Sequence, residues 1–142
     1  MRKEISIMIR KKMIVMACTL ATCAMMSSMP VLADTASYNW KFNSTVGTLP
    51  TGSGYKNDSE QNYYITISSG NVSSSNIFGT RIRRAADDAL MSKYVLHRGL
   101  KMSVPYAYSA KANTTSRYYM KGKKDSASST TSPLNVAGKV TY

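Results

Sequence analysis

Apolar and polar residues alternate with a period of two through most of the chain beyond residue 34. Tyr38, Trp40 and Phe42, for example, alternate with polar residues, which places three aromatic rings on one face of a predicted strand. The same alternation recurs in six later segments, separated by stretches rich in Gly, Pro, Asn and Ser. The seven predicted strands are residues 38–43, 61–68, 77–84, 91–97, 101–109, 116–123 and 134–142.

Seven short strands without a sustained helical period predict an all-β fold, a small antiparallel β-sandwich of about seven strands. An immunoglobulin-like arrangement is one version of this sandwich, although the chain has no Cys…Trp…Cys pattern. Pro105 removes a hydrogen bond from the ladder of its strand. That strand is therefore expected at a sheet edge or with a bulge.

Residues 84–96 allow two interpretations. Their alanines and Leu90 could form a short amphipathic helix, with Arg84 and Asp88 as an i,i+4 pair. Alternatively, a loop at Asp87-Asp88 leads into a strand that begins at Met91. The loop and strand are favoured because the neighbouring segments are strands of similar length.

The first 33 residues are typical of a secretory signal peptide. Basic residues cluster at the front, an apolar run follows from Met13 to Met26, and Val31-Leu32-Ala33 precedes the expected cut. The run is short for a bilayer span, and Pro30 follows it. We therefore expect a signal peptide at 1–33 and a single secreted or cell-surface β-rich domain at 34–142. A flexible Ser/Thr-rich loop is expected at 125–133.

Two alternatives concern the leader. Translation from Met8 would give a leader of more ordinary length, and Leu20-Ala21-Thr22-Cys23 is close to a lipoprotein cleavage box. Both cysteines, Cys18 and Cys23, lie in the leader, so the mature chain is cysteine-free. Without disulfides the domain must be held by its core, which its many aromatic residues can supply.

Positive charge is concentrated in the C-terminal part of the chain. Residues 77–142 carry a net charge of +9, whereas residues 34–76 carry −1. An exported cationic surface meets anionic lipid headgroups, phosphate-rich wall polymers or acidic glycans. Nucleic acid, the usual partner of a basic patch, is not expected outside the cell. The alternative is that the charge only keeps a Ser-rich protein soluble.

Signals for catalysis are almost absent. The single histidine, His97, is expected as an exposed structural residue at a strand end. Asp87 and Asp88 are the one carboxylate pair, and on a strand they would point to opposite faces, which suits acid–base work poorly. No phosphate loop, paired zinc ligands or calcium-loop spacing occurs. The sequence therefore predicts no enzyme, no cofactor and no metal site.

Two basic and aromatic clusters remain as candidate binding residues. Tyrosines beside cations can stack on sugar rings or lie at a headgroup interface, while the cations hold phosphates. The alternative is that the lysines only protect an exposed strand edge from aggregation. The candidate residues for an anionic surface are Arg81, Arg83, Arg84, Tyr119, Lys121, Lys123 and Lys124.

Four segments carry a resemblance: the leader ending Val31-Leu32-Ala33, residues 82–88, Val104-Pro105-Tyr106 and residues 135–142. In general character the chain resembles small exported proteins of Gram-positive bacteria that have no assigned function. It is also loosely similar to secreted bacteriocins of the lactococcin 972 type. This resemblance implies a compartment and a β-rich architecture rather than an activity.

Two functions of different class fit these features. The first is a secreted, non-enzymatic basic protein of the cell surface or medium that acts as a binding or structural module for an anionic surface. The alternative is a secreted, bacteriocin-like antagonistic protein, although no strongly amphipathic helix is visible for membrane attack.

Overall fold

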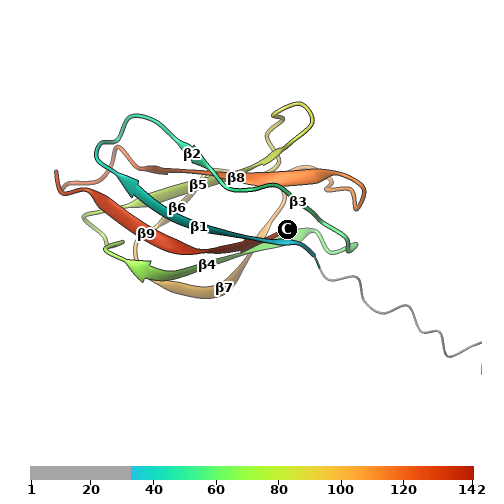
Figure 1. The fold of residues 1–142 in the computed structure, drawn as a ribbon, viewed down its shortest axis with the longest axis horizontal. Helices are drawn as coiled ribbons and strands as arrows, with labels where there is room; N and C mark the ends of the chain where they lie inside the picture. The colour runs from blue at the N-terminus through green and yellow to red at the C-terminus, as the bar shows by residue number, and fades with distance from the viewer. Residues whose placement is uncertain (1–32) are drawn as a thin grey trace, which may run out of the picture. The chain divides into compact units, whose positions relative to one another are not determined.

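The computed structural model describes residues 33–142, which form nine β-strands (Figure 1). The predicted signal peptide lies outside the described residues except for Ala33, as do Met8 and Cys23. The strands are β1 (Thr35–Phe42), β2 (Leu49–Pro50), β3 (Gly54–Tyr55), β4 (Asn62–Gly70), β5 (Phe78–Arg84), β6 (Val95–His97), β7 (Lys101–Ala107), β8 (Arg117–Lys124) and β9 (Leu134–Thr141).

The strands form two antiparallel sheets that pack face to face as a β-sandwich (Figure 1). Sheet A has the order β1-β9-β4-β7, and sheet B has the order β2-β8-β5-β6, with β3 also paired to β8. The all-β sandwich predicted from the alternation is therefore confirmed.

The strand pairs are nested along the chain. The first strand pairs with the last, β2 and β3 pair with β8, β4 pairs with β7, and β5 pairs with β6. The chain thus pairs like one long hairpin that is rolled up until β9 also meets β4 and β8 also meets β5. This is the arrangement of a jelly roll, and its strand order differs from that of an immunoglobulin domain.

All seven predicted strands are present, with some differences in length. β2 and β3 are additional, and they lie in a turn-rich stretch of Gly and Pro for which no strand was predicted. Pro105 lies in β7, which is an edge strand of sheet A, as its missing N–H requires.

Residues 84–96 form a turn and then a short strand, and none of them is helical. The strand is confined to β6. Before it, the backbone N–H of Ile82 donates to the hydroxyl of Ser92 at 2.9 Å, in place of the backbone carbonyl that a continuous strand would supply. Only an isolated bridge joins Leu90 to Arg83 before that point.

Aromatic rings from both sheets fill the core. Phe78 of sheet B meets three rings of β1, with centroid distances of 5.9 Å to Tyr38, 6.1 Å to Trp40 and 6.4 Å to Phe42. These three rings lie on one face of β1, as the alternation predicts, although Trp40 is only partly buried. The core therefore combines these aromatic contacts with buried aliphatic side chains such as Ile65, Ile67 and Val140.

Candidate anion-binding face

Strands β5 and β8 lie side by side and present their charged residues on the same side of sheet B. The inward positions of β5 are filled by Phe78, Thr80 and Ile82, so that Arg81 and Arg83 face outward. We call the outward residues Arg81, Arg83, Tyr119, Lys121 and Lys123 the cationic face.

The register of the two strands brings like charges together. Arg81 lies directly opposite Lys121, and Arg83 lies opposite Tyr119. Like charges at directly opposite positions repel each other and destabilise a sheet. An anion bound over the cationic face would therefore reduce this repulsion.

One end of the cationic face is neutralised by Asp88 from the turn after β5. Arg83 Nη1 donates to Asp88 Oδ2 at 3.0 Å, and Lys121 Nζ lies 3.4 Å from the same oxygen. The hydroxyl of Tyr119 donates to Asp88 Oδ1. This hydrogen bond, followed by the charges of Arg83 and Lys121, holds the pKa of Asp88 below its usual value.

The other end carries the ring of Tyr94, which lies over Gly79. A Cβ on Gly79 would fall 1.7 Å from the Tyr94 hydroxyl, so only glycine admits the ring here. Arg81 Cζ lies 5.4 Å from the ring centroid and Lys123 Nζ lies 5.7 Å from it, both at cation–π distance. Two cations are thus held beside one aromatic surface.

The hydroxyl of Tyr94 donates to Asp125 Oδ2 at 2.8 Å. Burial and this carboxylate raise the pKa of Tyr94, so the phenol stays protonated. Burial opposes ionisation of Asp125, but the backbone N–H of Ala127 and the Tyr94 hydroxyl outweigh it and lower the pKa of Asp125. Asp125 is therefore ionised near neutral pH and fixes the ring in place.

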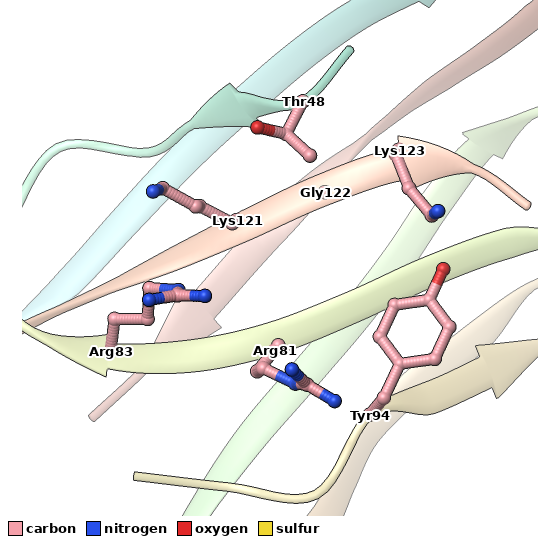
Figure 2. Close-up of a pocket in the computed structure, with 7 residues that line it drawn as sticks. All are labelled: Thr48, Arg81, Arg83, Tyr94, Lys121, Gly122 and Lys123. Atoms are coloured by element: carbon pink, nitrogen blue, oxygen red, sulfur yellow. The ribbon is translucent and has the colours of Figure 1, made fainter. Parts of the chain in front are cut away.

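A hollow of about 280 Å³ lies between these two ends (Figure 2). Figure 2 shows the Arg81 and Lys123 side chains beside the Tyr94 ring, with Thr48 on the far side of β8. The Arg81 side chain makes no hydrogen bond or ion pair with any residue in the range 33–142, and its Nε is without a partner there. The residues that line the hollow are Thr48, Arg81, Arg83, Tyr94, Lys121, Gly122 and Lys123.

Two of the predicted site residues lie elsewhere. Arg84 is engaged by Asp87, with Nε–Oδ1 and Nη2–Oδ2 distances of 2.9 and 2.7 Å. Lys124 points inward, is 2% exposed, and donates from Nζ to the carbonyls of Thr130 and Ser132, each at 2.7 Å. Alternation along β8 already separates Lys124 from Lys121 and Lys123, since adjacent strand residues face opposite sides.

The sequence prediction missed Tyr94, Thr48 and Asp88 as parts of this surface. The sequence predicts Tyr94 only as part of a strand, and no local pattern marks a tyrosine that will lie over a glycine of the neighbouring strand. Asp88 has a φ of +57°, a backbone conformation that Asp adopts more readily than most residues. That turn carries its carboxylate back over β5, and pairing of distant strands then brings in Tyr119 and Lys121.

His97 is buried, and the prediction of an exposed histidine is therefore wrong. It faces inward from β6, where its Nε2 lies 2.8 Å from Thr80 Oγ1 and its Nδ1 lies 3.5 Å from the Tyr106 hydroxyl. Burial, followed by the charge of Lys101, lowers the pKa of His97 to about 4. Its position between the sheets makes it a structural residue.

Within residues 33–142, no group of three or more His, Cys, Asp or Glu side chains is arranged to hold a metal ion. The same residues include no helix long and apolar enough to cross a membrane. Comparisons of the chain with models of known families, with curated proteins and with solved structures find no match.

Proposed function

We propose that this protein is a secreted, non-enzymatic module that binds an anionic surface outside the cell through its cationic face. The leader typical of export and the excess of positive charge beyond residue 77 both support this role. The observation that carries the proposal is the guanidinium of Arg81, which has no ion-pair partner among residues 33–142 and lies beside Lys121 and Lys123 on one side of sheet B.

The other sheet provides a contrast. On the outward side of its strands β1 and β9, the cations are Lys41 and Lys139, which lie opposite Asn135 and Ser37. Each of these lysines stands alone among small or polar neighbours, whereas the cations of β5 and β8 are adjacent. An anionic surface would therefore bind sheet B more strongly than sheet A.

The test is retention of the purified protein on isolated cell walls and on vesicles that contain anionic lipid. The double variant Arg81→Gln/Arg83→Gln removes two charges from the cationic face. It is expected to lose about 2 kcal/mol of binding free energy, since each basic residue near an anionic surface contributes about 1 kcal/mol. Binding by the parent protein should also weaken as salt is added.

The matched control is Lys41→Gln/Lys139→Gln, which removes the same charge from sheet A. This variant is expected to bind as the parent does. Equal binding by the parent and the Arg81/Arg83 variant would show that the charge serves solubility only. Neither double variant should change the unfolding free energy greatly, because partly exposed charges contribute little to it.

A further inference from the structure

The cationic face contains two comparable positions for an anion, of which the chain itself fills one. At the first, the Asp88 carboxylate is bound by an arginine from β5, a lysine from β8 and a tyrosine hydroxyl. The second lies one step along the same strands, at the hollow lined by Arg81, Lys121, Lys123 and Tyr94. The first position shows that these strands bind the oxygen atoms of an anionic group.

The second position has more positive charge than the described chain neutralises. Four cations line the hollow, and the carboxylates near them are those of Asp88 and Asp125. About two positive charges therefore remain, and Arg81 and Lys123 are the lining cations that make no ion pair with a carboxylate within residues 33–142. A carboxylate or a phosphodiester would supply one negative charge, whereas a phosphate monoester supplies about 1.5 to 2 near pH 7.

The hollow, of about 280 Å³, has room for a group that is larger than an anion alone. Arginine and lysine can hold phosphate oxygens, and the Thr48 side chain lies on the same rim. The Tyr94 ring, fixed through Asp125, offers an apolar surface beside the cations for the carbon skeleton of a sugar or polyol.

We propose that this hollow is a binding site for a phosphate monoester carried on a sugar or polyol, with Arg81 and Lys123 holding the phosphate. This inference rests on the proposed function and names the chemical group that the cationic face selects. The same group occurs in soluble sugar and polyol phosphates and in the headgroup of phosphatidate.

The first experiment titrates the protein with glycerol 3-phosphate and inorganic phosphate, followed by calorimetry and by amide NMR shifts. Shifts are expected at Gly122, Lys123 and Tyr94. The variant Arg81→Gln/Lys123→Gln should bind about 30-fold more weakly, on the scale of about 1 kcal/mol per charge. Lys41→Gln/Lys139→Gln is the control and should bind as the parent does. Equal affinity in the first variant and the parent would overturn the proposal.

The second experiment compares ligand charges. Dimethyl phosphate, a monoanion, should bind about fivefold more weakly than glycerol 3-phosphate at pH 7.5, which corresponds to the loss of one charge. Equal binding by the diester would rule out selection for the monoester. Acetate, another monoanion, should also bind more weakly than the phosphate monoester.

A pH series distinguishes titration of the ligand from titration of the protein's own groups. A phosphate monoester loses its second charge as pH falls through about 6, so its binding should weaken about fivefold between pH 7.5 and 5. The facing groups keep their charge in this range: the pKa values of Asp88 and Asp125 are lowered, those of Tyr94 and Tyr119 are raised, and the remaining groups are arginines and lysines. His97, with a pKa of about 4, lies on the other side of the sheet. Inorganic sulfate, which stays doubly charged, should show no such change. Identical pH profiles for the two anions would contradict the proposal.

Vesicles distinguish the two sources of the group and the two proposals. Stronger binding to phosphatidate than to phosphatidylglycerol at equal surface charge identifies the lipid headgroup, whereas equal binding, with glycerol 3-phosphate still bound in solution, identifies a soluble ester.

Wall retention that depends on Arg81 and Arg83, together with no binding of any phosphate monoester, would uphold the proposed function and overturn this inference. Phosphate binding without wall or vesicle retention would overturn the proposed function instead.

Discussion

Two glycines of sheet B decide where large rings lie on its two sides. Gly79 faces outward and leaves room for Tyr94, and Gly122 faces inward beneath Trp40 and Phe78. A Cβ on Gly122 would lie 2.4 Å from the Trp40 ring and 2.8 Å from the Phe78 ring. Because Phe78 belongs to the core cluster and the Trp40 ring packs against that cluster, neither ring can move away without disturbing its neighbours.

The substitution Gly122→Ala is therefore expected to destabilise the protein by about 1–3 kcal/mol, the range for inserting a methyl group into a packed core. Denaturant unfolding followed by the fluorescence of Trp40, the single tryptophan, measures this. Gly52→Ala is the control, since a Cβ there meets nothing within 4 Å and stability should hardly change. Equal stability of the two variants would mean that Trp40 and Phe78 are not held as described.

His97 makes stability depend on pH. Its pKa is lowered from 6.5 to about 4 by burial, so the unfolded chain binds a proton more readily than the folded protein. Its contribution is fully present above pH 6.5 and is lost as pH falls from 6.5 to 4. The loss should reach about 3 kcal/mol at pH 4, at about 1.4 kcal/mol for each pKa unit.

Unfolding free energies measured between pH 7 and 4 test this expectation. The variant His97→Gln should show a much flatter slope between pH 6.5 and 4.5, whatever its absolute stability. The lowered pKa values of Asp87 and Asp88 place their titration lower, with that of Asp87 at about 2. A wild-type slope retained by the variant would show that another group is responsible.

At the scale of the element, strand β8 serves two different surfaces. Its outward residues belong to the cationic face, while Tyr118, Met120 and Lys124 point inward and are buried. Lys124 is the inward residue that carries charge, and its Nζ holds two carbonyls of the Ser/Thr-rich loop at 125–133. The loop has further fixed contacts, such as the 3.0 Å bond from the N–H of Ile77 to Ser128 Oγ.

Replacing Lys124 by Met should therefore loosen this loop. The two loop carbonyls would lose a charged donor, and a hydrogen bond that involves a charged group contributes about 1.5–3 kcal/mol. We expect a lower unfolding free energy and faster proteolysis within residues 125–133. The adjacent variant Lys123→Met loses the same charge from the outward side and should leave both measurements close to those of the parent. Equal proteolysis of the two variants would contradict the anchoring role.

At the scale of the whole molecule, the fold depends on pairing between distant parts of the chain. Thr35 in β1 pairs with Thr141 in β9, and β9 lies between β1 and β4 in sheet A. Folds of this kind must close long loops before strand pairing is rewarded, so they fold slowly, in milliseconds to seconds.

Refolding followed by Trp40 fluorescence should accordingly fall in the range of milliseconds to seconds. A chain that ends at Pro133, and so lacks β9, should show no cooperative unfolding transition, because β1 would lose its only partner strand among the described residues. Refolding in microseconds, or cooperative unfolding of the shortened chain, would show that local structure rather than the β1–β9 pairing holds the fold.

The sequence by itself determined seven of the nine described strands and the inward faces of strands such as β1 and β5. Alternation is a local property, so the pattern at Tyr38, Trp40 and Phe42 was enough to identify a strand and its buried side. The edge position of β7 followed from Pro105, since a missing N–H is also a local fact. Alternation likewise placed Arg81 and Arg83 on one side of their strand.

Only the tertiary structure decided which strands are neighbours and what their surfaces contain. The order of the sheets depends on pairing over long separations, so no local pattern distinguished a jelly roll from an immunoglobulin-like sandwich. The cationic face exists because β5 pairs with β8, and its hollow exists because Tyr94 crosses Gly79. The burial of His97 and Lys124 has the same origin, because solvent exposure depends on what the rest of the chain places over a residue.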